Sequence, residues 1–271
     1  MTTSNPSVSL DKSSAPPPLP PTYQEPQLLP EPRRCGAEAG VVWVKSAFAM
    51  FKKNFWLWLG VAFTMSVVVT LFSVVPILGI LMGLITLVFT GGLMKAAAAQ
   101  ARGETPTFGY LFSAFETHFK PLVILALLYL LGLVIVFAIM FGFFFLLAVA
   151  GVLDPLLIAD DMSMNTLLVL LLVALVLSAP ILALLMSLWF SPPLIVLHDI
   201  APLEAMKKSL QASLRNWLPM LVMSLVFCAI FMILAIFTLG IGMLAAMPMI
   251  LLMYYTSYRD IWTDQPLSVN E

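Results

Sequence analysis

Six apolar runs divide the chain, and each has at least about the length of a membrane-spanning helix. A hydrocarbon core of about 30 Å needs about 20 helical residues. The runs cover residues 55–75, 77–99, 121–152, 165–190, 218–239 and 241–258. Polar positions within them are few and scattered. This pattern predicts an all-α integral membrane bundle of six transmembrane helices.

The shortest connections determine which runs are neighbours. Val75-Pro76 and Leu239-Gly240 are such tight turns that the runs on either side of each must form antiparallel hairpins. The third run is longer than a span requires. We therefore expect it to tilt, to bend near Gly132 or Gly142, or to extend beyond the hydrocarbon.

Three further segments carry large apolar residues at helical spacing, with charged residues on the other positions. The apolar positions are Val44, Phe48, Phe51 and Phe55; Phe108, Leu111, Phe112, Phe115 and Phe119; and Leu203, Met206, Leu210, Leu214 and Trp217. Amphipathic helices of this kind lie in the plane of the membrane interface, with bases toward anionic headgroups. We expect three cytoplasmic interfacial helices. Their expected lipid contacts are Lys52, Lys53, Lys120, Lys207, Lys208 and Arg215.

The three amphipathic segments end alike. Asn54-Phe55, His118-Phe119 and Asn216-Trp217 each place Asn or His before an aromatic residue at the start of an apolar run. This likeness favours a threefold repeat of an interfacial helix plus a hairpin. Late in the second and fourth runs, Gly91-Gly92 and Pro192-Pro193 occupy corresponding positions. They are candidate helix interruptions, either at a binding site or at a kink that neighbouring helices accommodate.

The distribution of charge orients the bundle. Threading six spans places all 13 Lys and Arg residues on one side, whereas the opposite turns carry only Asp154, Asp160 and Asp161. Short loops rich in Lys and Arg stay in the cytoplasm. We therefore expect a multi-pass protein with both termini in the cytoplasm. The 61% of hydrophobic and 10% of charged residues exclude an ordinary soluble domain.

Both ends of the chain lie outside the apolar domain, which we place at residues 40–262. Residues 1–39 are rich in proline and poor in large apolar residues, which predicts a disordered tail. This tail is a spacer or, through residues 18–23, a ligand for a protein partner that binds Pro-rich peptides. Residues 263–271 form a short cytoplasmic tail. The net charge of -1 gives no reason to expect a nucleic-acid partner.

Candidate chemistry is sparse. Neither His118 nor His198 stands in a metal-binding motif, so we expect no metal, no cofactor and no enzyme. His198-Asp199 is a possible acid/base pair, although Asp199 fits better as the cap of the next helix. Lys95 is the only charge within an apolar run and lies at its inner end, which disfavours ion coupling. Cys35 and Cys228 are expected to be free thiols.

A Gly-x-x-x-Gly pattern, Gly79 and Gly83, occurs in the second run and permits close helix packing, including dimerisation. The sequence leaves the oligomeric state open.

Several stretches of the second half carry a family resemblance. They are residues 189–198 (Trp-Phe-Ser-Pro-Pro-Leu-Ile-Val-Leu-His), 202–206 (Pro-Leu-Glu-Ala-Met), 214–219 (Leu-Arg-Asn-Trp-Leu-Pro) and 258–261 (Tyr-Arg-Asp-Ile). With them the chain resembles, over about residues 40–262, an uncharacterised family of bacterial inner-membrane proteins. It is similar, more loosely, to the membrane domain found beside some glycerophosphodiester phosphodiesterases. The resemblance implies a bacterial origin and this topology, and it implies no catalytic residue.

Three functional hypotheses follow. The preferred one is a non-enzymatic protein that organises membrane lipids or partner proteins at the inner face of the bacterial cytoplasmic membrane, since three basic amphipathic segments surround a core without buried charge. The alternative is a permease or flippase-like carrier for a small or amphipathic molecule, based on the Gly-Gly and Pro-Pro interruptions. The third is an intramembrane enzyme using His198-Asp199 beside Glu204 and Lys207.

Overall fold

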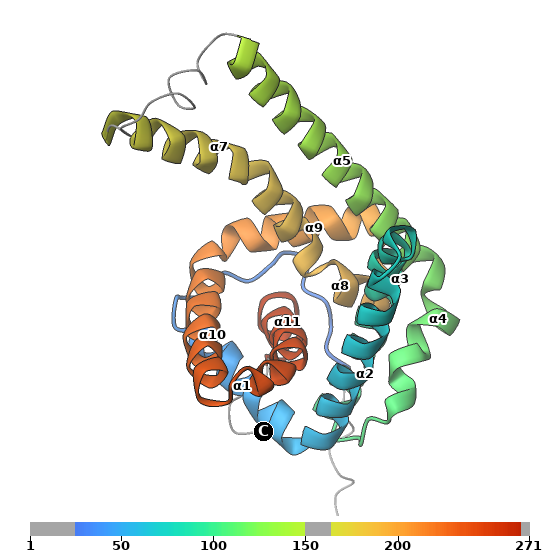
Figure 1. Ribbon diagram of the computed structural model, residues 1–271. Helices are drawn as coiled ribbons and strands as arrows, with labels where there is room; N and C mark the ends of the chain where they lie inside the picture. The colour runs from blue at the N-terminus through green and yellow to red at the C-terminus, as the bar shows by residue number, and fades with distance from the viewer. Residues whose placement is uncertain (1–24, 150–163, 267–271) are drawn as a thin grey trace, which may run out of the picture.

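The computed structural model describes residues 25–149 and 164–266, most of them helical (Figure 1). The long helices are α2 (Phe55–Ser73), α3 (Pro76–Ala101), α5 (Phe119–Val149), α7 (Met164–Trp189), α10 (Trp217–Phe237) and α11 (Ala246–Trp262). Within these described residues, six segments are long and apolar enough to cross a membrane. The fourth continues from α7 into α8 (Ser191–His198), and the sixth includes the 3-10 turn η2 (Ile241–Ala245). The prediction of an all-α chain with six candidate spans is confirmed.

The three amphipathic segments differ in regularity. Helices α1 (Ala39–Lys53) and α9 (Pro202–Arg215) form as expected. The middle segment is instead a 3-10 turn, η1 (Phe108–Phe112), followed by the short α4 (Ser113–Thr117). The expectation of one regular helix here is wrong. The backbone of η1 packs tightly on α3, and this packing overrides the helical pattern of the segment.

Two of the amphipathic segments, α9 and α1, complete a ring of helices, and α4 lies on its outer side (Figure 1). The η1–α4 segment packs against α3, the second helix of the hairpin that precedes it in the chain. Helix α9 likewise packs against α7 and α8, which precede α9. Helix α1 packs against α10 and α11, so the first segment contacts the last hairpin. In Figure 1, α11 lies inside the resulting ring. This cyclic order means that no amphipathic segment relies on its own hairpin alone.

The junction between each amphipathic segment and its span has one repeated conformation. The φ and ψ angles are -129° and 47° at Asn54, -129° and 24° at His118, and -120° and 29° at Asn216. Each junction carbonyl accepts a hydrogen bond from the N–H four residues later, at 3.1, 3.2 and 3.2 Å. The aromatic residue that follows each junction is exposed. Shared geometry at three places supports the threefold repeat.

Helices α5 and α7 lean away from the ring (Figure 1). Only 17% and 6% of the residues in their most apolar windows are buried, compared with 61% for the α3 span and 56% for the α11 span. The 31 residues of α5 correspond to about 46 Å of helix. Helix α5 continues without a break through Gly132 and Gly142, which leaves tilt or extension beyond the hydrocarbon as the way to accommodate its length.

Residues 25–38 form an extended arm that packs on the end of α11. The amide N–H of Leu29 donates to Trp262 O, and that of Arg33 donates to Ile261 O, both at 2.8 Å. Asn216 is fully buried and holds the arm from the α9–α10 junction, accepting from Cys35 N–H at 2.8 Å and donating to Arg33 O at 2.9 Å.

The expected boundary of a disordered tail at residue 39 is therefore wrong for residues 25–39. The sequence pattern missed this because the arm is held by backbone hydrogen bonds, which leave no hydropathy signal. The start of the C-terminal tail is fixed as well, since the hydroxyl of the buried Thr263 donates to Arg259 O at 2.5 Å. The Pro-rich stretch at residues 18–23 and the acidic turn with Asp154, Asp160 and Asp161 lie outside the described residues.

Candidate functional site

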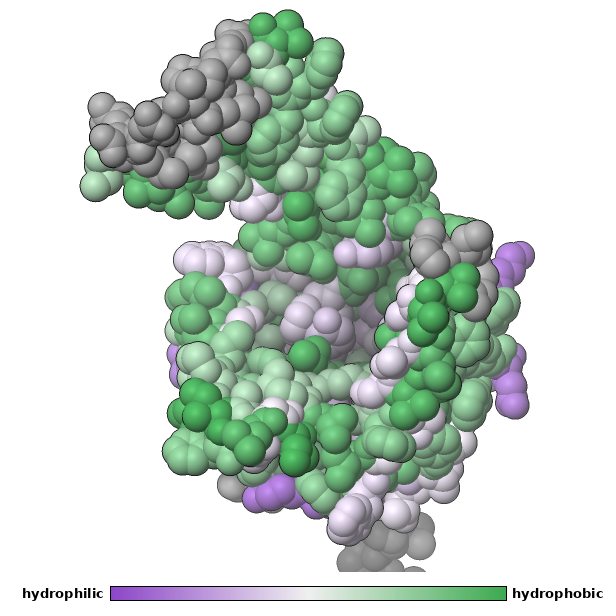
Figure 2. All heavy atoms as spheres, in the orientation of Figure 1, coloured by the Kyte–Doolittle hydropathy of each residue, from purple (hydrophilic) through white to green (hydrophobic). Residues whose placement is uncertain are grey.

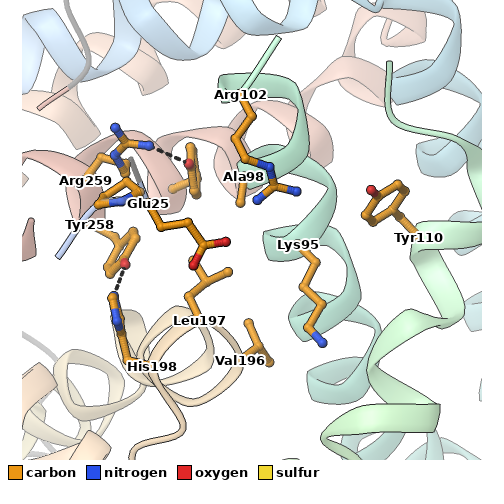
Figure 3. Close-up of a pocket in the computed structure, with 12 residues that line it drawn as sticks. Glu25, Lys95, Ala98, Arg102, Tyr110, Val196, Leu197, His198, Tyr258 and Arg259 are labelled. Carbon is orange, nitrogen blue, oxygen red and sulfur yellow. Dashed lines mark hydrogen bonds between the residues drawn. The ribbon is translucent and has the colours of Figure 1, made fainter. Parts of the chain in front are cut away.

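A cavity of about 320 Å³ lies where the arm, α3, η1, α8 and α11 meet (Figure 3). Three bases line it, Lys95 and Arg102 from α3 and Arg259 from α11. Glu25 of the arm is the one acid among its lining residues in the described part of the chain. Three tyrosines and a histidine complete its polar wall: Tyr110, Tyr255, Tyr258 and His198. The cavity is therefore cationic and rich in hydrogen-bond donors.

The continuity of α3 brings two of the bases together. Lys95 and Arg102 are seven residues apart on one helix, so they share a face with Ala98 between them. The predicted interruption at Gly91-Gly92 is wrong, since α3 continues through both. Their role is close packing: a Cβ at Gly92 would lie 2.5 Å from Tyr110 O, and one at Gly91 would lie 2.6 Å from Leu122 Cδ1.

Near the interruption predicted at Pro192-Pro193, the helix breaks at Phe190, and both prolines lie within the next helix. Helix α7 ends at Trp189 and α8 begins at Ser191, with the prolines in its first turn, where their missing N–H groups cost no helical hydrogen bond. The N–H of Phe190 at the break donates instead to Ser209 Oγ of α9 at 2.8 Å. The break lets Val196, Leu197 and His198 of α8 reach the cavity.

Polar groups of α11 and the C-terminal segment fix the far wall. Arg259 is buried, donating to Tyr255 Oη at 3.0 Å and to Gln265 O at 3.1 and 2.8 Å. The ring of His198 hydrogen-bonds to the Tyr258 hydroxyl, which ties α8 to α11. This wall is thus preorganised, with its guanidinium and phenol groups held in place.

On the other side, a chain of hydrogen bonds runs from α3 to the end of α8. Lys95 Nζ donates to Thr117 Oγ1 at 2.6 Å, Thr117 Oγ1 lies 2.9 Å from His118 Nδ1, and His118 Nε2 lies 2.9 Å from Asp199 Oδ1. His198 and Asp199 thus bond to different partners, which removes the basis for an acid/base pair. Nor does Asp199 cap α9 as expected, since it ends α8 at a left-handed φ of 54°. Ala201 stands at the start of α9 instead.

Arg102 is oriented by an exposed carboxylate outside the cavity lining. Its Nε and Nη2 atoms donate to the two carboxylate oxygens of Glu104 at 2.5 and 3.3 Å. Tyr110 Oη donates to the same carboxylate at 3.4 Å. The hydrogen bond from Arg102 is the main reason why the pKa of Glu104 is lowered from its usual value. The pair keeps the guanidinium beside the cavity.

The predicted lipid contacts do not gather at one place. Lys52, Lys53, Lys120 and Lys207 are exposed. Lys208 instead packs with Nζ 5.5 Å from the centre of the Trp262 ring, and Arg215 forms an ion pair with Glu31 of the arm at 3.3 Å. At the candidate packing residues Gly79 and Gly83, an added Cβ would meet nothing within 4 Å. These glycines therefore have no close-packed partner in the described chain.

The cavity was missed because no sequence motif marks it. Its bases come from the ends of two separate apolar runs, where such residues are normally taken for membrane-interface anchors. Among the described residues, no group of three His, Cys, Asp or Glu side chains could hold a metal ion. The donors that do converge are suited to an anionic group, because guanidinium and ammonium ions with phenol hydroxyls bind phosphate or carboxylate oxygens.

The fold and the cavity define a class: an all-helical membrane protein in which a ring of helices encloses a cationic cavity. The sequence matches the family model of a domain of unknown function, DUF7847, over residues 37–263. The chain belongs to this family. No curated protein and no solved structure matches it.

Proposed function

We propose that the protein is a non-enzymatic component of a bacterial cytoplasmic membrane that binds an anionic group at its inner face, and so organises lipids or a partner there. The cationic cavity is the observation that carries this proposal. With both termini in the cytoplasm, the cavity opens at the level of the lipid headgroups. Neighbouring bases add about 1 kcal/mol each to the attraction of anionic lipid.

The ligand chemistry is a phosphate or carboxylate group, carried by a lipid or by a small soluble molecule. Lys95 supplies an ammonium donor and Arg102 a planar guanidinium donor from one helix face, and the Tyr258 hydroxyl lies on the opposite wall (Figure 3). Nothing in the lining requires a reaction to follow binding. The looser resemblance to the membrane domain beside some glycerophosphodiester phosphodiesterases carries no activity to this chain.

The test compares two double variants with the same change in charge. Lys95→Gln with Arg102→Gln alters the cavity, and Lys53→Gln with Lys120→Gln alters exposed interfacial positions. Each full-length protein is placed in nanodiscs containing phosphatidylglycerol, with or without added inorganic phosphate, and retained adducts are counted by native mass spectrometry. We expect the cavity pair to lose about tenfold in retention, since a hydrogen bond to a charged group contributes about 1.5–3 kcal/mol.

The two probes separate the sources of the anion. Retained phosphatidylglycerol indicates a lipid headgroup, and retained phosphate in its place indicates a soluble ligand. Equal losses in both double variants would mean that only diffuse surface charge attracts anions, and the proposal would be wrong.

A carrier for a small or amphipathic molecule is the second candidate. It is favoured by the α7–α8 break beside the cavity. It is also favoured by the hollow inside the ring, where less apolar residues lie between strongly apolar surfaces (Figure 2). A single cysteine replacing Leu197 in a Cys-free background tests it. A carrier requires labelling from both membrane sides, whereas labelling from one side only would count against transport.

A further inference from the structure

An apolar groove of about 350 Å³ lies between α1, α10 and α11. It shares no lining residue with the cationic cavity. Buried Phe51, Phe231 and Met249 lie among its lining residues, and exposed Phe48, Phe55 and Ile230 belong to the same lining. Its volume is near the lower end of the range of about 300–1,000 Å³ for small-ligand pockets.

The lining of this groove is held by packing within the chain. The rings of Phe51 and Phe55 meet edge to face with centroids 5.3 Å apart, and those of Phe227 and Phe231 lie 4.4 Å apart. Helix α1 packs along both α10 and α11. The groove is thus a preformed concavity beside a candidate span, where lipid acyl chains are the available apolar partner.

Two lysines beside the groove distinguish it from an ordinary apolar gap between packed helices. Lys45 lines the groove, and Lys52 Nζ lies 5.1 Å from the centre of the Phe48 ring. Positions 45, 48 and 52 share one face of α1. Helix α1 contains no acidic residue, and neither lysine forms an ion pair with any residue that the structure describes. Two bases therefore lie beside an apolar groove on the helix that precedes the first span.

A second apolar groove provides a comparison. It lies between α7 and α10, has a volume of about 470 Å³, and is lined by residues that include Met186, Trp189 and Leu221. Although it is larger, none of its lining residues is charged. Of these two grooves, the one at α1 pairs an apolar floor with bases at its edge. This pairing is complementary to an anionic phospholipid, because the apolar floor can bind an acyl chain and the lysines can bind the phosphate of the headgroup.

We propose that the α1 groove binds one anionic phospholipid, with an acyl chain along Phe231 and Phe51 and the headgroup between Lys45 and Lys52. This site is distinct from the cavity and rests on the orientation in which α1 lies at the inner membrane face. The lipid would connect α1 to the last hairpin and so reinforce the contact that closes the ring.

Three variants of the full chain test the site in nanodiscs of phosphatidylglycerol and phosphatidylcholine. Lys45→Gln with Lys52→Gln removes the bases, and Ile230→Trp fills the groove from a partly exposed position. Lys120→Gln with Lys207→Gln is the matched control for charge, and Leu225→Trp, at an exposed position of α10 outside the groove, is the control for bulk. Native mass spectrometry then counts phosphatidylglycerol retained after collisional activation.

We expect the wild-type chain to retain one phosphatidylglycerol in this groove, and both groove variants to lose at least threefold of that signal, while both controls keep it. If either control loses as much as its partner, or if phosphatidylcholine is retained equally, the proposal is overturned. Thermal unfolding of each variant separates loss of the lipid from loss of the fold. Loss of phosphate binding in the cavity variants, with the groove lipid intact, would bear on the cavity proposal alone.

Discussion

The α3 and α11 spans of the ring and the leaning α5–α7 pair differ both in hydropathy and in burial. Within the ring, α3 and α11 bury more than half of the residues in their span windows. Helices α5 and α7 leave most of theirs exposed, although the hydropathy of those windows is higher, 3.2 and 2.6 against 1.5 and 1.3. Burial thus follows the less apolar spans. This is the arrangement expected in a bilayer, where the most apolar surfaces face lipid.

Because of this difference in hydropathy, the polar and small residues gather in the ring. The spans with lower hydropathy carry the small residues, tyrosines and bases that close helix packing and the cavity require, whereas α5 and α7 provide apolar surface. The ring is therefore where substitutions should alter the fold and ligand binding. The leaning pair should tolerate the same substitutions, and the four predictions below test that contrast.

The largest expected effect comes from alanine at Gly92. Its Cβ would lie 2.5 Å from Tyr110 O and 2.7 Å from Leu111 O, and backbone atoms cannot easily move aside. We expect Gly92→Ala to destabilise the protein by about 1–3 kcal/mol or more. At Gly132 the nearest atom is Leu184 Cδ1, at the flexible end of a side chain, and the effect should be small.

At Gly142 nothing lies within 4 Å, so alanine there should stabilise the helix by about 0.5–1 kcal/mol. Thermal unfolding of the three variants in the same lipid nanodiscs measures the order. A Gly142→Ala variant as unstable as Gly92→Ala would remove the distinction between the two regions.

The second prediction concerns the polar edge of the ring, where Cys35, one of the two free cysteines, lies. Burial, followed by the nearby Asp260 carboxylate, raises the pKa of the Cys35 thiol from 9.0 to about 12. Only the thiolate reacts with alkylating reagents, so at pH 8 we expect Cys35 to react about a thousandfold more slowly than in the unfolded chain.

The raised pKa also fixes the sign of a pH effect. The folded state holds this proton more tightly, so the stabilisation is complete below pH 9.0 and is lost as the pH rises toward 12. Alkylation by iodoacetamide is followed in a Cys228→Ser background from pH 7 to 10. Asp260→Asn should speed the reaction, and a Cys35 that reacts at the unfolded rate at pH 8 would contradict the buried environment.

The third prediction concerns the hydrogen bonds by which Asn216 fixes the arm to the ring. Replacing Asn216 by alanine removes the hydrogen bonds of its side chain with Cys35 N–H and Arg33 O. Both backbone groups of the arm then lack this partner. A lost hydrogen bond of this kind costs about 1–3 kcal/mol, so we expect trypsin to cleave at Arg33 and Arg34 about tenfold faster.

Asn54 provides the matched control, since it has the same junction conformation but its side chain makes no hydrogen bond within the described residues. Asn54→Ala should leave cleavage in the arm unchanged. Equal acceleration in both variants would show that the junction conformation, rather than the Asn216 side chain, secures the arm.

Hydropathy and connection length were enough to predict the spans. The turn at Val75-Pro76 marks the end of one helix and the start of the next because proline fits the first helical turn and little chain remains for a loop. The break near Pro192-Pro193 was likewise predictable, since two prolines within a helix remove hydrogen bonds that α7 would otherwise make.

Contacts made by small residues were not predictable from the same pattern. The large apolar residues of α9 were expected to face the membrane interface, and Leu203 and Leu214 are indeed exposed, whereas the contact with the rest of the chain is made by the buried Ala205, Ser209 and Ala212. Small side chains let helix backbones approach closely, and a search for large apolar residues overlooks them. The predicted interruption at Gly91-Gly92 was wrong for the same reason, because glycine occurs both where helices pack closely and where they are interrupted.

The cavity and the arm depend on the ring itself. Arg102 and Arg259 line one cavity because α3 and α11 pack together, and the position of Glu25 depends on hydrogen bonds between the arm and the C-terminal end of α11. None of these long-range contacts leaves a local periodicity. They had to be observed in the structure.

The smallest expected effect isolates the cavity from the rest of the ring. Glu25 brings negative charge to a site lined by Lys95, Arg102 and Arg259, so it competes with any anion that enters. At a separation near 4 Å, repulsion in a well-hydrated site is about 1 kcal/mol. Glu25→Gln should therefore raise the affinity for inorganic phosphate about fivefold, and Glu116→Gln, at an exposed position outside the cavity, should not. Phosphate titrations followed by native mass spectrometry at two salt concentrations measure both. Equal gains in the two variants would reflect net charge alone, whereas a gain confined to Glu25→Gln would make the arm a built-in competitor for the cationic cavity.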